Sequence, residues 1–223
     1  MFEIIHLHIP KTGGSSLLDL YRKNYGSNAV VSVKRASVKD KTKEELIHFF
    51  SAVESPQLKV LHGHFYWCEV AAYAKKSEKL KIVAFFRDPV ERVISNFFFF
   101  KKRIKEGKVT STNLKRMDET LLEYAALDES KNRMSKFMAG LEPENLFFAG
   151  LMENFESDVE ELFSMLGCNI TQVSKTNTNT HFLKERESIC ESVREIIAGY
   201  NQEDIELYER IVILKNLKRG KSI

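Results

Sequence analysis

The sequence predicts an α/β fold in which a central parallel sheet lies between two layers of helices. Short apolar runs alternate with amphipathic segments along the 223 residues, and this alternation is typical of strands connected by helices. The clearest run, residues 81–86 (KIVAFF), is apolar on both faces, as a strand inside a parallel sheet must be. No repeat or linker interrupts the pattern, so a single domain over residues 1–223 is expected.

Each expected element follows from a local pattern. The expected strands are the apolar runs at residues 2–9, 59–65, 81–86 and 146–150. The expected helices cover residues 15–25, 42–53, 69–76, 89–106, 113–127, 130–139 and 154–166, with two more between 183 and 217. Two helix starts carry capping signals, because Thr42 precedes Glu45 by three residues and Asp88-Pro89 precedes Glu91.

Composition excludes several classes of protein. Lys and Arg number 34 against 31 Asp and Glu, and a net charge of +3 does not fit a strongly basic nucleic-acid binder. No apolar run is long enough to span a bilayer, and the first run has the character of a core strand rather than a secretion signal. The three cysteines are far apart, which predicts free thiols. A cytoplasmic protein without a membrane span or nucleic-acid partner is expected.

The loop after the first expected strand has the composition of an anion site. Its residues are Lys11, Thr12, Gly13, Gly14, Ser15 and Ser16. Two glycines let successive backbone N–H groups turn inward, the following helix contributes the positive end of its dipole, and the lysine adds a full charge. This arrangement predicts binding of a phosphate or sulfate ester. The alternative is an ordinary Gly-Ser turn with a solvated lysine.

The order of residues in this loop differs from that of nucleoside triphosphatases. In a Walker A loop the lysine follows the glycines, whereas Lys11 precedes them. Asp88 is better placed to cap a helix than to bind magnesium, so no metal is expected. A sulfuryl group, with one negative charge, can be transferred without a divalent cation.

A second candidate anion contact follows residues 81–86. Arg87 leaves this strand at the carboxyl edge of the sheet, where ligands of α/β proteins bind, and its planar guanidinium suits a phosphate. Ser95 lies two turns along the following helix and could offer a hydroxyl to the same group. A structural Arg-Asp turn and a serine on a helix face are the alternative.

Histidines and aromatic residues supply further candidates. His62 and His64 end the second expected strand, and a histidine there could remove a proton from an acceptor hydroxyl. Two such histidines could also bind zinc, although no third ligand has suitable spacing, and a structural role is the common fate of a single histidine. The run Phe97–Phe100 is expected to be mostly buried, with the option that one or two rings line an acceptor cleft.

Three of these segments resemble motifs of sulfotransferases that use 3′-phosphoadenosine 5′-phosphosulfate (PAPS). PKTGGSSL, at residues 10–17, is similar to their 5′-phosphosulfate loop, and RDPVERVIS, at residues 87–95, is similar to their 3′-phosphate motif. The HGH segment at residues 62–64 resembles the carbohydrate branch, notably the heparan and uronyl 2-O-sulfotransferases.

The resemblance implies a P-loop-like sulfotransferase fold, PAPS as the donor, no metal, and a hydroxyl-bearing acceptor on a glycan or glycoconjugate. It implies that Arg87 and Ser95 hold the 3′-phosphate and that His64 is the general base, with His62 as a helper or structural partner. Lys11 is expected to neutralise the leaving-group oxygen. Thr180 and Lys184 are expected to contact the donor from a loop before the last helices.

Two other functions fit the sequence. A small-molecule kinase of the P-loop class would share the fold but require ATP and magnesium. A non-catalytic nucleotide-binding or glycan-binding module could keep the fold without the chemistry.

Overall fold

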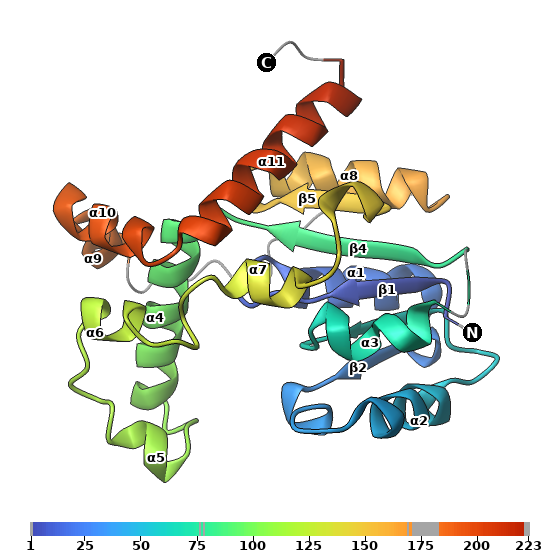
Figure 1. Ribbon diagram of the computed structural model, residues 1–223, viewed down its shortest axis with the longest axis horizontal. Coiled ribbons are helices and arrows are strands. Elements are labelled where there is room, and N and C mark those ends of the chain that lie inside the picture. The colour runs from blue at the N-terminus through green and yellow to red at the C-terminus, as the bar shows by residue number, and fades with distance from the viewer. Residues whose placement is uncertain (1, 76, 78, 169, 171–182, 221–223) are drawn as a thin grey trace.

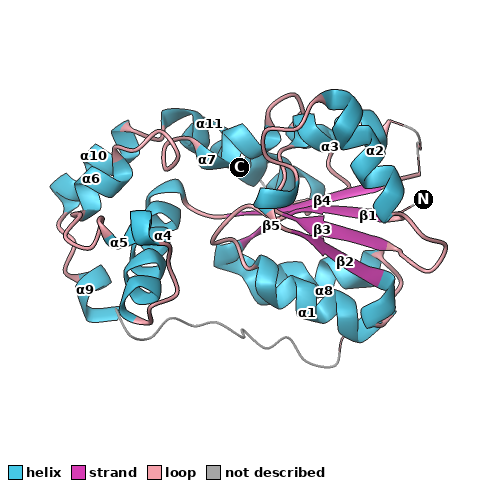
Figure 2. Ribbon diagram, turned by 90° about the horizontal axis from the view of Figure 1, so that it is seen from below, coloured by secondary structure: helices cyan, strands magenta, loops and turns pink. Residues whose placement is uncertain are grey.

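A five-stranded parallel sheet forms the centre of the computed structural model, which describes residues 2–75, 77, 79–168, 170 and 183–220. The strand order is β2-β3-β1-β4-β5, so β1 lies in the middle (Figures 1 and 2). The strands are β1 (Ile4–Leu7), β2 (Val30–Val33), β3 (Val60–Gly63), β4 (Lys81–Phe86) and β5 (Phe148–Leu151). The predicted α/β class with a central parallel sheet is confirmed.

Helices cover both faces of this sheet (Figure 2). One face carries α1 (Gly14–Tyr25) and α8 (Phe155–Met165), whose apolar sides share a core with β1, β3, β4 and β5. The other face carries α2 (Lys43–Val53), α3 (Trp67–Ala74), α7 (Arg133–Met138) and part of α11 (Gln202–Lys218). The sheet is therefore buried on both sides, which explains why its strands are apolar throughout.

A third group of helices lies beyond the carboxyl edge of the sheet (Figures 1 and 2). It consists of α4 (Pro89–Lys105), α5 (Ser111–Leu114), α6 (Leu121–Ala125), α9 (Leu183–Glu187) and α10 (Glu191–Gly199). A separate apolar cluster joins α4, α6 and α10. Single 3₁₀ turns occur at η1 (Ser27–Ala29), η2 (Arg35–Ser37), η3 (Pro143–Asn145) and η4 (Met152–Asn154).

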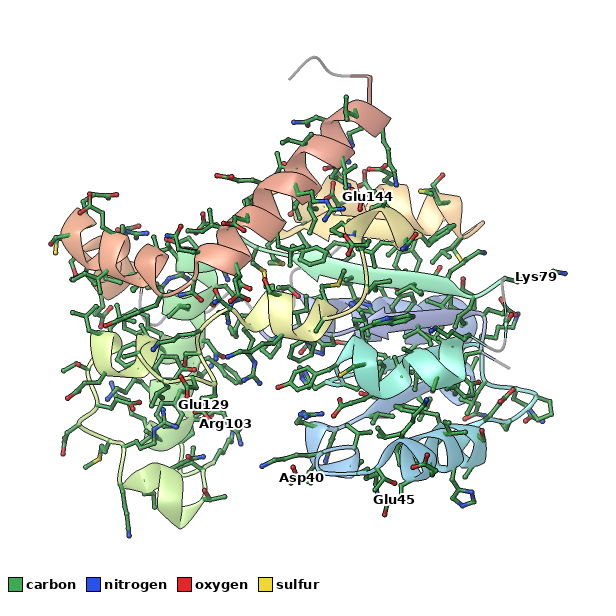
Figure 3. All side chains as sticks on the ribbon, viewed as in Figure 1. Asp40, Glu45, Lys79, Arg103, Glu129 and Glu144 are labelled. Atoms are coloured by element: carbon green, nitrogen blue, oxygen red, sulfur yellow. The ribbon has the colours of Figure 1, made fainter. Side chains whose placement is uncertain are left out.

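Helix α11 connects this group to the sheet through buried charges. Asp204, at its start, is fully buried, accepts hydrogen bonds from the backbone of Met134 and Ser135, and lies 3.6 Å from Nε of the buried Arg92. Farther along, Lys215 pairs with Asp158 of α8 at 3.2 Å. An exposed pair between Arg210 and Glu144 holds the middle of α11 against η3. Glu144 is labelled in Figure 3.

The two predicted helix caps are present. Thr42 and Glu45 form a reciprocal capping box at the start of α2. Asp88 accepts a hydrogen bond from the backbone of Glu91 at 2.9 Å and caps α4, with Pro89 as its first residue. Both caps depend only on local sequence, since the donor and acceptor are three residues apart.

Three boundaries differ from the sequence prediction. Strand β2 was not expected; it is a four-residue edge strand with a polar Ser32, so it lacks a continuous apolar run. The helix expected over residues 113–127 is two short helices, because Thr120 and Glu123 form a capping box that starts α6 anew. The C-terminal segment contains three described helices rather than two, because the chain breaks twice. Cys190 has extended backbone and separates α9 from α10, and Asn201, whose side chain bonds the carbonyl oxygen of Ile197, separates α10 from α11.

None of the described helices combines the length and apolar character needed to cross a membrane.

Candidate active site

The three motifs singled out in the sequence meet at one edge of the sheet. Leu7, at the end of β1, is level with Gly63 of β3 on one side and with Ala84 of β4 on the other. The loop after β1, the histidines at the end of β3 and Arg87 after β4 are therefore neighbours. After β1 the chain forms β2 and β3 on one side of β1 and then crosses to form β4 and β5 on the other side. Ligands of such folds usually bind at the carboxyl edge next to the strand where this crossing occurs.

The loop between β1 and α1 is tightly turned. Lys11 and Gly13 both have left-handed backbone, with φ of 72° and 81°. Thr12 is buried, and its hydroxyl donates to the carbonyl of Ile9 at 2.8 Å, which ties the loop to its own start. A Cβ on Gly13 would lie 2.4 Å from Cε2 of Phe155, so no larger residue fits without a shift of the α8 ring. The turn thus requires glycine for both conformation and space.

This turn leaves the start of α1 without a local counter-charge. Gly13 is the N-cap, no side chain caps the helix, and its first turn holds no acidic residue. The first amides of a helix have no carbonyl partners within it, and the helix dipole places partial positive charge there. The residues at this end, Gly14, Ser15 and Ser16, belong to the predicted anion loop.

Positive side chains gather around this helix end. Lys11 is partly buried, and its ammonium lies 4.2 Å from the ring centroid of Phe99 on α4. Burial, followed by the nearby charges of Arg87, Arg186 and Lys102, lowers the pKa of Lys11 to about 8. Such a concentration of like charge is unfavourable until an anion binds among the cations.

Arg87 lies beside this lysine. Its Nη1 donates to the carbonyl of Lys11 at 3.5 Å, and its Nη2 is 3.9 Å from Glu91. Burial, together with the charge of Arg186, lowers the pKa of Arg87. Ser95 is buried on α4, two turns after Asp88.

Arg186, on α9, is a residue of this edge that the sequence gave no reason to select. It donates to Glu91 at 2.9 Å, and Arg194 of α10 donates to the other oxygen of the same carboxylate at 2.6 Å. Nε of Arg186 is buried and has no partner among the described residues. The expected donor contact Lys184 is in the first turn of α9, whereas Thr180 lies outside the described residues.

The hydrogen bonds of His64 define which of its nitrogens carries the proton. Nδ1 lies 2.7 Å from the carbonyl oxygen of His8 and must donate to it, because a carbonyl can only accept. The neutral ring therefore keeps an unprotonated Nε2 with a free lone pair. Burial lowers the pKa of His64, and the charge of Arg133 adds to this, while the bond to the carbonyl of His8 acts against it.

His62 is engaged at both nitrogens. Nε2 donates to the carbonyl of Gly14 at 3.1 Å, and Nδ1 lies 3.3 Å from the hydroxyl of Ser32. Burial, followed by the neighbouring His6 and His64, lowers the pKa of His62 well below its usual value. The side chain of His62 therefore connects β3 to the anion loop, and each of its two ring nitrogens has a polar partner.

Comparisons with known proteins place this arrangement in a family. The profile described as Sulfotransferase family matches residues 2–209. The chain belongs to the Sulfotransferase family. No curated protein sequence matches it significantly.

Two solved structures share the sulfotransferase fold with this chain. One is a sulfotransferase from Alicyclobacillus acidocaldarius, with a TM-score of 0.52 and 14% identity over 100% of this chain and 97% of the other. The second is mouse sulfotransferase SULT7A1 in complex with PAP, with a TM-score of 0.54 and 11% identity over 98% of this chain and 89% of the other.

The aromatic run of this family member is only partly buried. Phe97 and Phe98 pack in the helical core, as expected, whereas Phe99 is 40% exposed beside Lys11. The structure therefore singles out one ring of the run as the one next to the anion loop. Among the described residues, no cluster of three His, Cys, Asp or Glu side chains is placed to hold a metal ion.

The loop geometry predicts unequal costs for two glycine replacements. Gly167→Ala, at the end of α8, should cost only the left-handed conformation, about 1–2 kcal/mol, because its φ is 74° and nothing lies within 4 Å of the new methyl group. Gly13→Ala should cost more than this, because the same conformational penalty is joined by the overlap with Phe155. Urea denaturation of both variants measures the difference, and equal losses would contradict the close contact.

Proposed function

We propose that this Sulfotransferase-family chain transfers the sulfuryl group of PAPS to an acceptor hydroxyl and releases adenosine 3′,5′-bisphosphate (PAP). The observation that carries the proposal is the pairing of two features at one sheet edge. One is the uncapped start of α1 surrounded by Lys11, Arg87 and Arg186; the other is His64 with an unprotonated Nε2. The PAP complex of mouse SULT7A1 supports the choice of donor.

Donor binding divides between the two ends of the nucleotide. The residues assigned to the 5′-phosphosulfate are Lys11, Thr12, Gly13, Gly14, Ser15 and Ser16. Arg87 and Ser95 are assigned to the 3′-phosphate, and Arg186 joins them because its charge acts on both Arg87 and Lys11. Thr180 and Lys184 remain proposed donor contacts on the resemblance to the family.

His64 is the proposed general base. Its Nε2 takes the proton of the acceptor hydroxyl as the oxygen attacks sulfur, and the bond between sulfur and the phosphate oxygen breaks. The lowered pKa keeps His64 unprotonated at neutral pH, so the base is in its active form. His62 is assigned the supporting role, because its two nitrogens already bond Gly14 and lie beside Ser32.

Lys11 is the proposed electrostatic catalyst. Its ammonium neutralises the charge that grows on the bridging oxygen of the departing PAP, and a positioned cation in a partly dehydrated site stabilises such charge more than water does. The weak interaction with the ring of Phe99 holds the side chain near the loop without neutralising it.

The acceptor is proposed to be a carbohydrate hydroxyl. The support is the likeness of residues 62–64 to the carbohydrate branch, together with the observed position of this segment beside the anion loop. Phe99 is exposed beside Lys11, and the charge of Lys102, which also pairs with Glu106, acts on Lys11. Both side chains are therefore proposed contacts for the acceptor.

The donor assignment predicts selective stabilisation by PAP. At one hundred times its dissociation constant PAP should add about 2.7 kcal/mol to the free energy of unfolding, and ADP and AMP should add much less, because they lack the 3′-phosphate. Thermal melting with each nucleotide measures this. Equal shifts for all three, or loss of the PAP shift in EDTA, would contradict the assignment, and a magnesium-dependent response to ATP would favour a kinase.

The pKa of Lys11 predicts how PAP binding depends on pH. The charged lysine binds the 5′-phosphate, so affinity should be constant below about pH 8 and should fall as the pH rises through that value. Lys11→Arg should remove this fall, because the guanidinium stays charged. Isothermal titration between pH 6.5 and pH 9.5 tests both proteins, and a fall that persists in the arginine variant would assign it to another group.

The role of His64 predicts a loss of turnover without a loss of donor binding. His64→Ala should lower kcat by about 10²–10⁴-fold and leave PAP affinity unchanged. As the pH increases, kcat of the unsubstituted protein should rise through an apparent pKa below 6.5, because burial favours the neutral ring of His64. This rise should be absent in His64→Ala.

His62→Ala is the matched control for that experiment. It should weaken the attachment of the anion loop to β3, so it should lower stability and PAP affinity more than it lowers kcat. If His62→Ala has no measurable activity while His64→Ala has nearly normal kcat, the roles of the two histidines are reversed.

A further inference from the structure

His8, the first residue after β1, contacts His64 in two ways. Its ring stacks on the ring of His64, with centroids 4.0 Å apart and planes 28° from parallel. Its carbonyl oxygen accepts the Nδ1–H of the same ring at 2.7 Å. The backbone bond selects the tautomer of His64, and the stacked ring restricts how the His64 side chain can rotate.

The other side of the His8 ring lies against the anion loop. A Cβ on Gly14 would be 2.0 Å from Cδ2 of His8, so the ring occupies the space that a side chain at position 14 would need. The ring of His62 lies 4.7 Å from that of His8, and His62 in turn bonds the carbonyl of Gly14. His8 therefore fills the space between His64 and the backbone of the loop.

We propose that His8 is a positioning residue that fixes the orientation of His64 and its distance from the loop at residues 11–16. The catalytic consequence rests on the proposed function, since it matters only if His64 acts on an acceptor while the loop holds the donor. The effect on the His64 ring itself depends on the observed contacts alone.

The surroundings of His8 fit a packing role rather than a second base. The side chain is 8% exposed, and burial with the nearby His64, His62 and Lys11 lowers its pKa well below the usual value. The ring thus stays neutral at the pH where His64 works, and it adds no charge to an edge already rich in cations. A flat, uncharged ring of this size is what the contact requires.

The groups that face His64 come from three directions. His8 lies on the loop side, His62 comes from β3, and Arg133 acts from α7. Of these, Arg133 carries a permanent charge, and it lowers the pKa of His64 whether or not His8 is present. Loss of the His8 ring should therefore disturb the orientation of His64 more than its charge state.

The test compares three replacements that separate ring shape from nitrogen chemistry. His8→Phe keeps a flat ring, His8→Leu keeps much of the volume without the plane, and His8→Ala removes both. His48→Ala, at an exposed histidine of α2, is the control. Thermal melting and PAP binding first establish that each variant is folded; if the alanine variant does not fold, the leucine variant answers the question.

The decisive measurement is the ¹⁵N NMR spectrum of the His64 ring, which needs neither donor nor acceptor. The parent, His8→Phe and His48→Ala should show a proton on Nδ1 and a bare Nε2. His8→Leu and His8→Ala should show averaged signals from both tautomers, because the ring is free to turn away from the carbonyl. A parent with its proton on Nε2, or an unchanged His64 in both the leucine and alanine variants, would overturn the proposal.

Turnover of PAPS with desulfated heparin as the acceptor gives the kinetic counterpart. His8→Leu and His8→Ala should lose about 10–100-fold in kcat with little change in KM for PAPS, since a small misplacement of the base is costly. His8→Phe should recover most of the loss. His64 signals that are averaged in His8→Leu and His8→Ala, together with no turnover by the unsubstituted protein, would support the positioning role of His8 and count against the proposed acceptor or activity. Failure of the positioning role and failure of the proposed function therefore give different results.

Discussion

The parallel pairing of β1 with β3 and β4 is the constraint on which the candidate site depends. Level ends of three adjacent strands bring the anion loop, the histidine segment and Arg87 to one edge, although they are separated by tens of residues in sequence. Burial of both sheet faces fixes the register, since a one-residue slip would move apolar side chains out of their layer. The two helix layers thus hold the spacing of the site.

Charge balance at this edge depends on Glu91. Lys11, Arg87, Arg186 and Arg194 come from the loop, the end of β4 and two C-terminal helices, and the carboxylate of Glu91 is the acidic group that bonds two of them. Burial acts to raise the pKa of Glu91, but the bonds from Arg194 and Arg186 hold it below its usual value. Glu153 and Asp88 also act on Arg87, but these three carboxylates are still fewer than the four cations. The surplus of positive charge suits this edge to the polyanionic nucleotide proposed as the donor.

His62 and His64 differ in how many of their ring nitrogens are bonded. His62 uses both ring nitrogens to connect β3, the edge strand β2 and the anion loop, while His64 uses one nitrogen for orientation and leaves the other open. Burial keeps both rings neutral, which avoids adding positive charge beside Lys11 and Arg87. The two histidines therefore differ through their partners: His62 has a partner at each ring nitrogen, and His64 has one at Nδ1.

Features that depend on short stretches of chain could be predicted from the amino-acid sequence. The alternation of apolar runs and helices predicts the α/β class, the caps at Thr42 and Asp88 follow from residues three positions apart, and the glycines of the loop indicate its turn. Only the tertiary structure revealed the edge strand β2, the approach of Arg186 to Glu91, and the tautomer of His64. These depend on contacts between segments 30 to 95 residues apart, and a local pattern carries no record of which distant carbonyl or carboxylate a side chain will meet.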